Sequence, residues 1–269
     1  MLPYLQLFNG KIPTYAILTI IGILLSGFYV CRTAKKRGHD DNDYIIFMLI
    51  CALGVLIGSH ILYGITKIPV IVELFTNWSK YISNIWDFAT AMGIIFGGAV
   101  FYGGLIGGAI AGWIYGKYKK FDIYEFSDIC APMVPLFHGF GRIGCFLGGC
   151  CYGIESDFGF TVNNNDLVPS LCGVNRFPVQ LMEALLNFCL FFLLAYLLKK
   201  DILKGRLFAT YLFIYSIIRF CDEFLRGDTY RGFLFGLSTS QIISILLFVG
   251  SVTYLVIFKF KKKKENRTI

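Results

Sequence analysis

Long apolar stretches separated by short polar segments run through the whole chain. A helix of about 20 residues crosses the roughly 30 Å hydrocarbon core of a membrane. Seven stretches reach or approach that length: 13–31, 44–64, 96–116, 127–148, 178–198, 206–224 and 237–258. The pattern predicts an all-α, polytopic integral membrane protein with about seven transmembrane helices. The first stretch lacks a basic leader and a small-residue cleavage site, so we expect it to be retained.

Composition supports this interpretation and excludes other classes. Of the 269 residues, 56% are hydrophobic and 16% are charged, whereas soluble domains carry about 25% charged residues. So much apolar surface excludes a soluble domain, a disordered chain and a small disulfide-rich scaffold. The net charge of +8 alone would suggest nucleic acid as a partner. The positions of the basic residues along the chain show whether that interpretation holds.

Basic residues are concentrated in alternate connecting segments. Segments 32–43, 117–121, 199–206 and 259–269 carry 17 of the 25 Lys and Arg residues, and the segments between them carry six. The positive-inside rule then places the N-terminus outside and the C-terminus in the cytoplasm. Anionic membrane lipids are the expected counter-ions of the basic tail, and no nucleic-acid partner is expected.

Two connecting segments on the predicted outer side differ from plain linkers. Residues 65–95 mix apolar and polar positions and include Trp78 and Trp86, a composition typical of helices that lie in the membrane interface. Residues 149–177 contain Ser, Asn, Asp and Gly clusters, which predict an irregular cap. We expect a single membrane-embedded domain over 1–269, with these two loops on its outer face.

Charged residues inside the predicted spans are the strongest functional signal. Arg142, Glu183, Arg219 and Glu223 fall in apolar runs, and Arg226 follows them toward the outer surface. An arginine at the centre of a span costs about 2.5–3.5 kcal/mol on insertion scales, so such residues face the bundle interior. One interpretation is internal ion pairing, for instance of Arg219 with Glu183. The other is an anion site, for which the planar guanidinium suits a phospholipid phosphate.

Glycines accompany these charges and allow two interpretations. Gly103, Gly104, Gly107 and Gly108 form small-xxx-small pairs, and Gly144 and Gly148 repeat the spacing near Arg142. Such pairs allow helices to approach closely. Missing side chains would equally leave room for a lipid chain or headgroup, and the sequence permits both.

Histidine and cysteine give weaker signals. His60 and His138 are candidates for a general base, because imidazole titrates near neutral pH, although a satisfied structural histidine is the commoner case. The sequence allows a disulfide from Cys150 or Cys151 to Cys172 on the outer face. The spacing H-x6-C-x4-C-C from His138 matches no zinc module, so no metal site and no cofactor are expected.

Six motifs, in order along the chain, resemble those of the bacterial prolipoprotein diacylglyceryl transferase family. They are PTYAIL around Tyr15, YGGLIG at 102–107, GRIGCFLGG with a following YG at 141–153, RFPVQLMEALL at 176–186, YSIIRFCDEFLRGD at 215–228 and LSTSQIISI at 237–245. The family's layout of seven spans with an outer N-terminus is similar to the one predicted above.

The resemblance implies an activity and its partners. Such enzymes transfer the diacylglyceryl group of phosphatidylglycerol to the lipobox Cys thiol in the signal peptide of a prolipoprotein, at the bacterial cytoplasmic membrane. It implies catalytic roles for Arg142, Arg219 and Tyr102, and His60 and His138 remain the candidates for the base. The substrate-binding set it implies is Tyr15, Gly103, Gly104, Arg142, Gly144, Gly153, Gln180, Glu183, Tyr215, Arg219, Glu223 and Arg226.

Three places depart from the family's motifs. Tyr102 stands at the motif His, Cys145 stands at the signature Asn, and Cys150–Cys151 stands where the family usually has an acidic and an apolar residue. The base at the usual position is therefore replaced, which leaves His60, His138 or an already ionised substrate thiol as alternatives. A sister lipid-modifying enzyme with another acceptor or headgroup, and a non-enzymatic lipid transporter or accessory membrane protein, remain alternative functions. A transporter would be expected to show paired inverted halves, which the sequence does not display.

Overall fold

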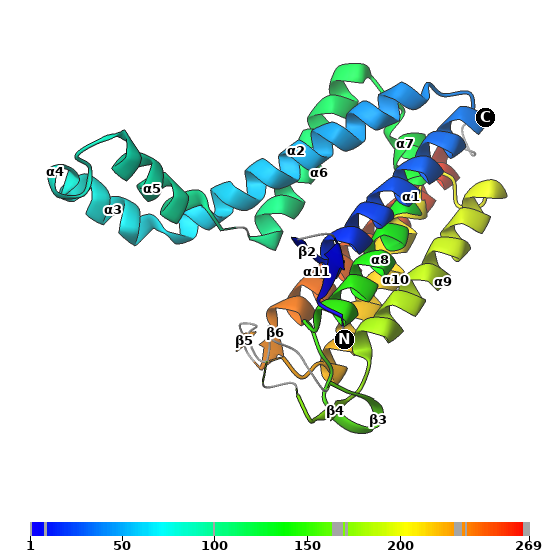
Figure 1. Ribbon diagram of the computed structural model, residues 1–269. Coiled ribbons are helices and arrows are strands. Elements are labelled where there is room, and N and C mark those ends of the chain that lie inside the picture. Colours follow the sequence, from blue (N-terminus) through cyan, green and yellow to red (C-terminus); the bar gives the residue numbers. More distant parts are fainter. Residues whose placement is uncertain are drawn as a thin grey trace. The chain divides into compact units, whose positions relative to one another are not determined.

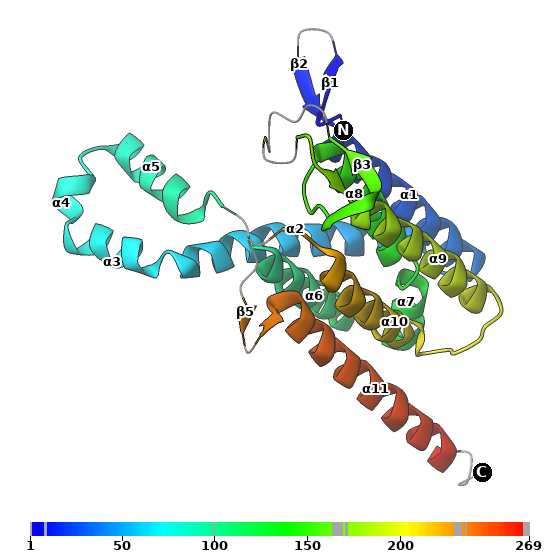
Figure 2. The same cartoon turned by 90° about the horizontal axis from the view of Figure 1, so that it is seen from below.

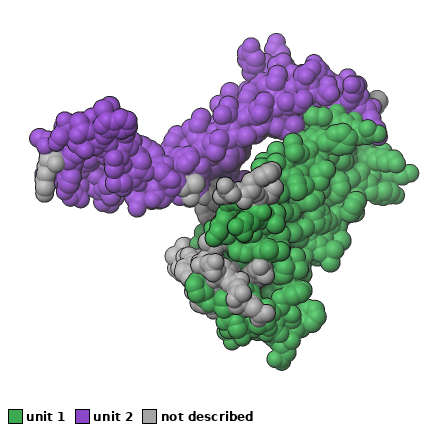
Figure 3. All heavy atoms as spheres, in the orientation of Figure 1, with its two compact units in different colours: residues 1–33, 124–269 green, residues 34–123 purple. Residues whose placement is uncertain are grey.

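The computed structural model describes residues 2–7, 10–98, 100–162, 169, 172–228, 233–234 and 236–265 (Figure 1). The chain divides into two compact units, coloured separately in Figure 3. Unit 1 comprises Met1–Thr33 and Tyr124–Ile269, and unit 2 comprises Ala34–Ile123. Each unit is described by itself.

Unit 1 is a bundle of long helices (Figures 1 and 2). Helix α8 packs against α9, and α10 packs against both α9 and α11. Pro132 lies between α7 and α8, where its ring and missing N–H favour the start of a new helix. The helices are α1 (Thr14–Lys36), α7 (Ile123–Cys130), α8 (Met133–Gly148), α9 (Val179–Lys199), α10 (Leu207–Asp222), the 3-10 turn η2 (Glu223–Leu225) and α11 (Thr239–Glu265).

The buried face of α9 changes character along its length. In its second half, Leu190, Leu194 and Leu198 pack with residues such as Leu207 and Tyr211 in the apolar core. In its first half, the same face carries the buried polar residues Gln180, Glu183 and Asn187, at a helical spacing of three and four. Because helical neighbours three and four apart share a face, α9 presents a polar surface to the bundle interior only near its N-terminal end.

Three short antiparallel hairpins complete unit 1. Strand β1 (Tyr4–Leu7) pairs with β2 (Gly10–Pro13), β3 (Glu155–Thr161) with β4 (Asn175–Arg176), and β5 (Phe233–Leu234) with β6 (Leu237–Ser238). The segment 149–177 was expected to be an irregular cap, and in its described part it contains a strand pairing around Arg176.

Unit 2 is a crossed pair of helices with a helical extension. Helix α2 (Asp41–Thr66), capped by the Asp40 side chain, packs along α6 (Phe101–Lys119). Between them lie α3 (Ile68–Thr76), α4 (Trp78–Tyr81) and α5 (Ile85–Phe96). The segment 65–95 is therefore helical, as its composition predicted, and its location in the membrane interface stays a prediction.

Glycines set the close approach of α2 and α6. A Cβ atom at Gly58 would collide with the Gly103 carbonyl oxygen, and one at Gly107 would collide with the Gly54 carbonyl oxygen. A Cβ at Gly104 would lie 3.1 Å from Val55 Cγ1. The interpretation of these glycines as helix-packing residues is therefore confirmed.

Replacement of Gly58 by valine is expected to destabilise unit 2. The new side chain would meet backbone atoms of α6, which cannot rotate away, and overpacking of this kind costs about 1–3 kcal/mol. Gly116 on α6 is the matched control, since a Cβ there would meet nothing within 4 Å. Thermal unfolding of the purified protein in detergent should show a lower midpoint for Gly58→Val and no loss for Gly116→Ala. Equal midpoints for the two variants would contradict this packing.

The helices identify a multi-pass membrane protein. Among the described residues, five helices are long and apolar enough to cross a membrane: Thr14–Lys36, Asp41–Thr66, Ile123–Gly148, Val179–Lys199 and Thr239–Phe260. The predicted spans 96–116 and 206–224 correspond to α6, with 19 residues, and α10, with 16 residues. The number of spans, the orientation and the single-domain organisation stay predictions.

Candidate functional site

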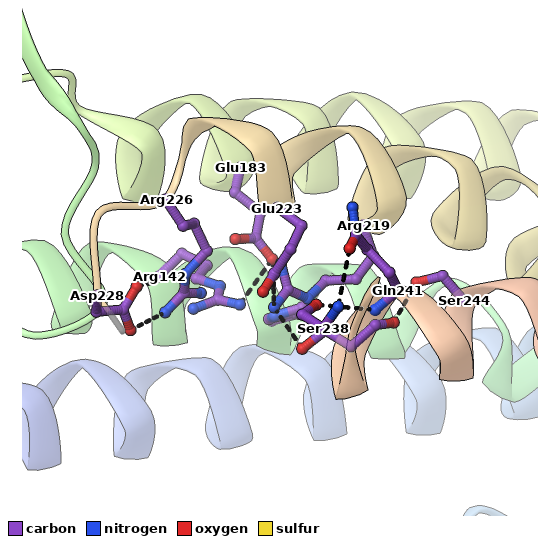
Figure 4. A network of polar contacts seen from close by, with 11 residues as sticks. Arg142, Glu183, Arg219, Glu223, Arg226, Asp228, Ser238, Gln241 and Ser244 are labelled. Carbon is purple, nitrogen blue, oxygen red and sulfur yellow. Dashed lines mark hydrogen bonds and ion pairs between the residues drawn. The ribbon is translucent and has the colours of Figure 1, made fainter. Parts of the chain in front are cut away.

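Arg142 and Glu183 form an ion pair in the interior of unit 1 (Figure 4). Arg142 comes from α8 and Glu183 from the polar half of α9, and their side chains are 12% and 1% exposed. Arg142 Nη2 lies 2.8 Å from Glu183 Oε1. Asn187, one turn further along α9, donates from Nδ2 to the Glu183 backbone carbonyl at 2.8 Å. The carboxylate therefore orients the guanidinium, and the ion pair links α8 to α9.

Arg219 is held from two sides. Its Nη2 atom lies 2.7 Å from Glu223 Oε2, one helical turn away (Figure 4). The same Nη2 atom donates to Ser240 Oγ on α11 at 2.9 Å. The sequence suggested Arg219 as a possible partner of Glu183, and this pairing is wrong because Glu183 pairs with Arg142. Partner choice depends on which helix faces bring the groups together, and helical spacing within one segment does not give that.

Both arginines retain unused hydrogen-bond donors. Arg142 Nε and Arg219 Nη1 are buried and have no hydrogen-bond partner among the described residues. An unsatisfied buried donor costs about 1–3 kcal/mol, and more when it is charged. In each case a carboxylate holds one end of the guanidinium while another N–H remains available to an acceptor. Phosphate oxygens are acceptors that match such donors.

Arg226 is engaged differently. Its Nε donates to Asp228 Oδ1 at 3.1 Å and its Nη2 to Asp228 Oδ2 at 2.8 Å. This forked contact uses one whole edge of the guanidinium. Arg226 also forms a backbone bridge with Gly153, so it joins the segment after α10 to the loop after α8. The structure thus gives Arg226 and Gly153 scaffold contacts beside the arginine pair.

Aromatic rings and a glycine surround the arginines. Tyr215 on α10 packs on His138, with ring centroids 5.3 Å apart, and stacks on Tyr211. His138 Nε2 also lies 3.6 Å from Glu183 Oε1. Tyr15 on α1 packs on Gly144, where a Cβ would come within 3.0 Å of the tyrosine ring. His138, Tyr215, Arg142 and Glu183 therefore form one cluster, with Tyr15 approaching α8 from α1. Arg219 lies in the same network of polar side chains (Figure 4).

Three cysteines lie close together at the end of α8. The sulfur atoms of Cys145, Cys150 and Cys151 all lie within 4.8 Å of one another. Gln180 Nε2 donates to the Cys150 carbonyl at 2.9 Å, which attaches this loop to α9. Hydrogen bonds from the Cys145 and Cys150 thiols lower the pKa of the Cys151 thiol, and the positive charges of Arg226 and Arg142 lower it further. Cys150, Cys151 and Cys172 are all described and are not in a disulfide, so the bridge to Cys172 that the sequence allows is not formed.

Four of the predicted site residues belong to unit 2. His60 on α2 has its Nδ1 atom 2.8 Å from both the Phe96 and the Gly98 carbonyl oxygens. Carbonyl oxygens only accept, so Nδ1 carries a proton and donates to them. Tyr102 lies on α6, and its side chain falls outside the described residues. Gly103 and Gly104 pack against α2, as described above.

Some residues of the cluster were not singled out from the sequence. These residues hold side chains or backbone of the cluster: Asp228 contacts Arg226, Ser240 contacts Arg219, and Asn187 contacts the Glu183 backbone. Helical spacing could have indicated only Asn187, which lies four residues after Glu183 on one face of α9. Ser240 lies on a different helix from Arg219, and only the tertiary packing brings the two together.

The fold and the site define a multi-pass membrane protein with a buried pair of arginines that can receive an anionic group. A family model for prolipoprotein diacylglyceryl transferase matches residues 3–257. The chain belongs to this family.

Curated relatives agree with this assignment over nearly the whole chain. A protein of Clostridium tetani named phosphatidylglycerol–prolipoprotein diacylglyceryl transferase is 35% identical, over 96% of this chain and 98% of its own length. A protein of Clostridium perfringens named phosphatidylglycerol–prolipoprotein diacylglyceryl transferase 2 is 32% identical, over 97% of this chain and 96% of its own length. A protein of Geobacter sulfurreducens named phosphatidylglycerol–prolipoprotein diacylglyceryl transferase is 33% identical, over 92% of this chain and 91% of its own length.

Proposed function

We propose that this protein transfers the diacylglyceryl group of phosphatidylglycerol to the lipobox Cys thiol of prolipoproteins, at the bacterial cytoplasmic membrane. The product is a thioether, and glycerol phosphate leaves. The observation that carries this proposal is the pair of buried arginines, Arg142 and Arg219, each with an N–H donor that no described residue accepts. The names of the curated relatives support the substrates.

The chemistry requires stabilisation of a departing phosphate. The substrate thiolate attacks the glyceryl carbon that bears the phosphate ester, so a C–S bond forms while the C–O bond breaks. The electron pair of the broken bond moves to the phosphate oxygen, and charge there increases. Donors that are already oriented stabilise such charge most effectively, because they need no reorganisation during the reaction. Arg142 and Arg219 are assigned this role, and no protein thiol needs to act as a nucleophile.

The carboxylates and Ser240 are positioning residues in this proposal. Glu183 and Glu223 each hold one Nη2 atom, and Ser240 accepts from the second arginine. Tyr15, Gly144, Gln180 and Tyr215 shape the surroundings of Arg142 and are assigned to binding the lipid. Gly103 and Gly104, which pack α2 on α6, are assigned an indirect role through that packing.

The proton of the substrate thiol is proposed to pass to a histidine, with His60 favoured over His138. In this proposal Nε2 of His60 takes the proton, while Nδ1 donates to the Phe96 and Gly98 carbonyls, which hold the ring in place. His138 instead packs on Tyr215 beside Glu183, where it is placed to orient Arg142.

We expect His60→Gln to slow transfer by about 10²-fold and to remove the acidic limb of the pH–rate profile. A base must be deprotonated to act, so the wild-type rate should fall as pH decreases through the pKa of the base. His138→Gln is the matched variant and should keep the limb. If both variants retain the wild-type profile, no histidine is the base, and an already ionised substrate thiol attacks directly.

The test of the function itself uses the purified protein in detergent with phosphatidylglycerol and a synthetic lipobox peptide. The expected result is a peptide whose mass increases by one diacylglyceryl group. A peptide with Ser in place of the lipobox Cys is the control and should stay unmodified. Consumption of phosphatidylglycerol without peptide modification would indicate a sister enzyme with another acceptor, and no consumption would contradict the proposal.

A further inference from the structure

We propose that Cys145, Cys150 and Cys151 form a three-thiolate binding site for a thiophilic d10 metal ion, with Cu⁺ favoured over Zn²⁺. The site does not depend on the proposed transfer reaction, which uses no protein thiol. Its three sulfur atoms lie within 4.8 Å of one another, and none of them is in a disulfide. A metal–sulfur bond of about 2.3 Å places three bound sulfurs roughly 4 Å apart. The observed cluster therefore needs little movement to close around one ion.

The backbone at this loop holds the cluster in place. Gly149 and Cys151 both adopt left-handed conformations, with φ of 77° and 59°, a backbone region that few non-glycine residues adopt. The Cys150 N–H donates to the Cys145 carbonyl at 3.1 Å, which turns the chain back over the last turn of α8. The contact of Gln180 with the Cys150 carbonyl fixes the loop from α9. The thiols are thus gathered by a local fold and not by chance proximity on an open surface.

The ligand set favours a soft ion of low coordination number. Thiolates select Cu⁺ and Zn²⁺ over harder cations. Among the described residues, the group contains three cysteines and no fourth His, Cys, Asp or Glu ligand. Three thiolates complete a trigonal Cu⁺ site, whereas Zn²⁺ would require water as a fourth ligand.

Cationic groups lie beside the cluster. Arg142 and Arg226 are both close enough to Cys151 to interact with it electrostatically. They also pair with Glu183 and Asp228, so they offset only part of the negative charge of a metal–thiolate complex. This charge does not discriminate between Cu⁺, whose complex with three thiolates carries −2, and Zn²⁺, whose complex carries −1. Cys145 lies on α8 three residues after Arg142, so a bound ion would adjoin the arginine pair.

The proposal is tested by metal titration of the full chain, purified in detergent under anaerobic, reducing conditions. Cu⁺ is added against a chromophoric Cu⁺ chelator, and Zn²⁺ is added in a separate arm against a chromophoric Zn²⁺ chelator. We expect one equivalent of Cu⁺ to bind, with a thiolate-to-metal absorption band in the ultraviolet. Cys150→Ser and Cys151→Ser should each weaken binding by about 10²-fold or more, since even a change outside the ligands costs 10–100-fold.

Matched controls use cysteines outside the cluster. Cys189 and Cys221 are exposed and free, and Cys189→Ser and Cys221→Ser should bind metal as the wild type does. One equivalent of Zn²⁺ in place of Cu⁺, lost in the same two variants, would support the thiolate site and reassign its ion. Binding of neither ion by the wild type, or undiminished binding by Cys150→Ser and Cys151→Ser, would overturn the proposal. A disulfide among the three cysteines in the anaerobically purified protein, seen by intact mass, would overturn it as well.

Discussion

Arg142→Lys is expected to lose most of the transferase activity even though it keeps a positive charge beside Glu183. A lysine ammonium supplies a point charge, whereas the arginine fork holds the carboxylate with Nη2 and still offers Nε to a phosphate oxygen. Removing one oriented donor from a charge-stabilising site costs about 10²–10³-fold in rate. Initial rates with phosphatidylglycerol and the lipobox peptide measure the effect.

The lysine variant separates catalysis from folding. Arg142→Ala should abolish transfer, but it also leaves the Glu183 carboxylate buried without its partner, so part of its defect would be structural. Arg142→Lys avoids that problem, and its thermal unfolding midpoint should stay near that of the wild type. Arg32→Lys, on α1 in the predicted inner half of the bundle, is the matched control and should keep full activity. Near-normal turnover in Arg142→Lys would contradict a role for the forked contact.

Replacement of Glu183 by alanine is expected to give the largest loss of stability at the site. Glu183 is 1% exposed and faces the Arg142 guanidinium at 2.8 Å. Breaking a buried pair by removing one partner costs about 3–5 kcal/mol, because the remaining charge is uncompensated. Glu183→Gln keeps a hydrogen-bond acceptor for Arg142 and should be destabilised less. Thermal unfolding midpoints measured in detergent should be highest for the wild type, lower for Glu183→Gln and lowest for Glu183→Ala.

The control for this prediction is a glutamate in an exposed pair. Glu155 is 72% exposed and lies 3.5 Å from Arg176, a kind of contact that contributes about 0–1 kcal/mol. Glu155→Ala should therefore unfold at nearly the wild-type temperature. If Glu183→Ala also unfolded near that temperature, the Arg142–Glu183 pair would not be the structural element described above.

The sequence predicted the helices more completely than the contacts between them. Apolar runs of membrane-spanning length mark most of the long helices, because hydrophobicity over 20 residues is a local property. The spacing of Gly103 and Gly107 predicted close helix packing there, but it did not give Gly54 and Gly58 on α2 as the partners. The sequence could not identify Glu183 as the partner of Arg142, because that pairing depends on how α8 and α9 are rotated against each other.

The cysteine cluster shows the same limit at the scale of a loop. The spacing of Cys145, Cys150 and Cys151 suggested no metal module, and an outer-face bridge to Cys172 was a reasonable expectation. The left-handed conformations at Gly149 and Cys151 reverse the chain over the end of α8 and gather the three thiols. A glycine signals such a reversal in a sequence, but a cysteine with positive φ has no sequence signature.

The proposed binding of the phosphate of phosphatidylglycerol by Arg142 and Arg219 can be measured directly as lipid retention. Native mass spectrometry of the purified protein, titrated with phosphatidylglycerol, measures the fraction of protein that retains one lipid. We expect wild type and Arg32→Lys to retain phosphatidylglycerol equally. Arg142→Lys and Arg219→Lys should retain it at least about 10-fold more weakly. This is the loss expected for a charge-assisted contact of about 1.5–3 kcal/mol. Equal retention by all four proteins would contradict the proposed binding.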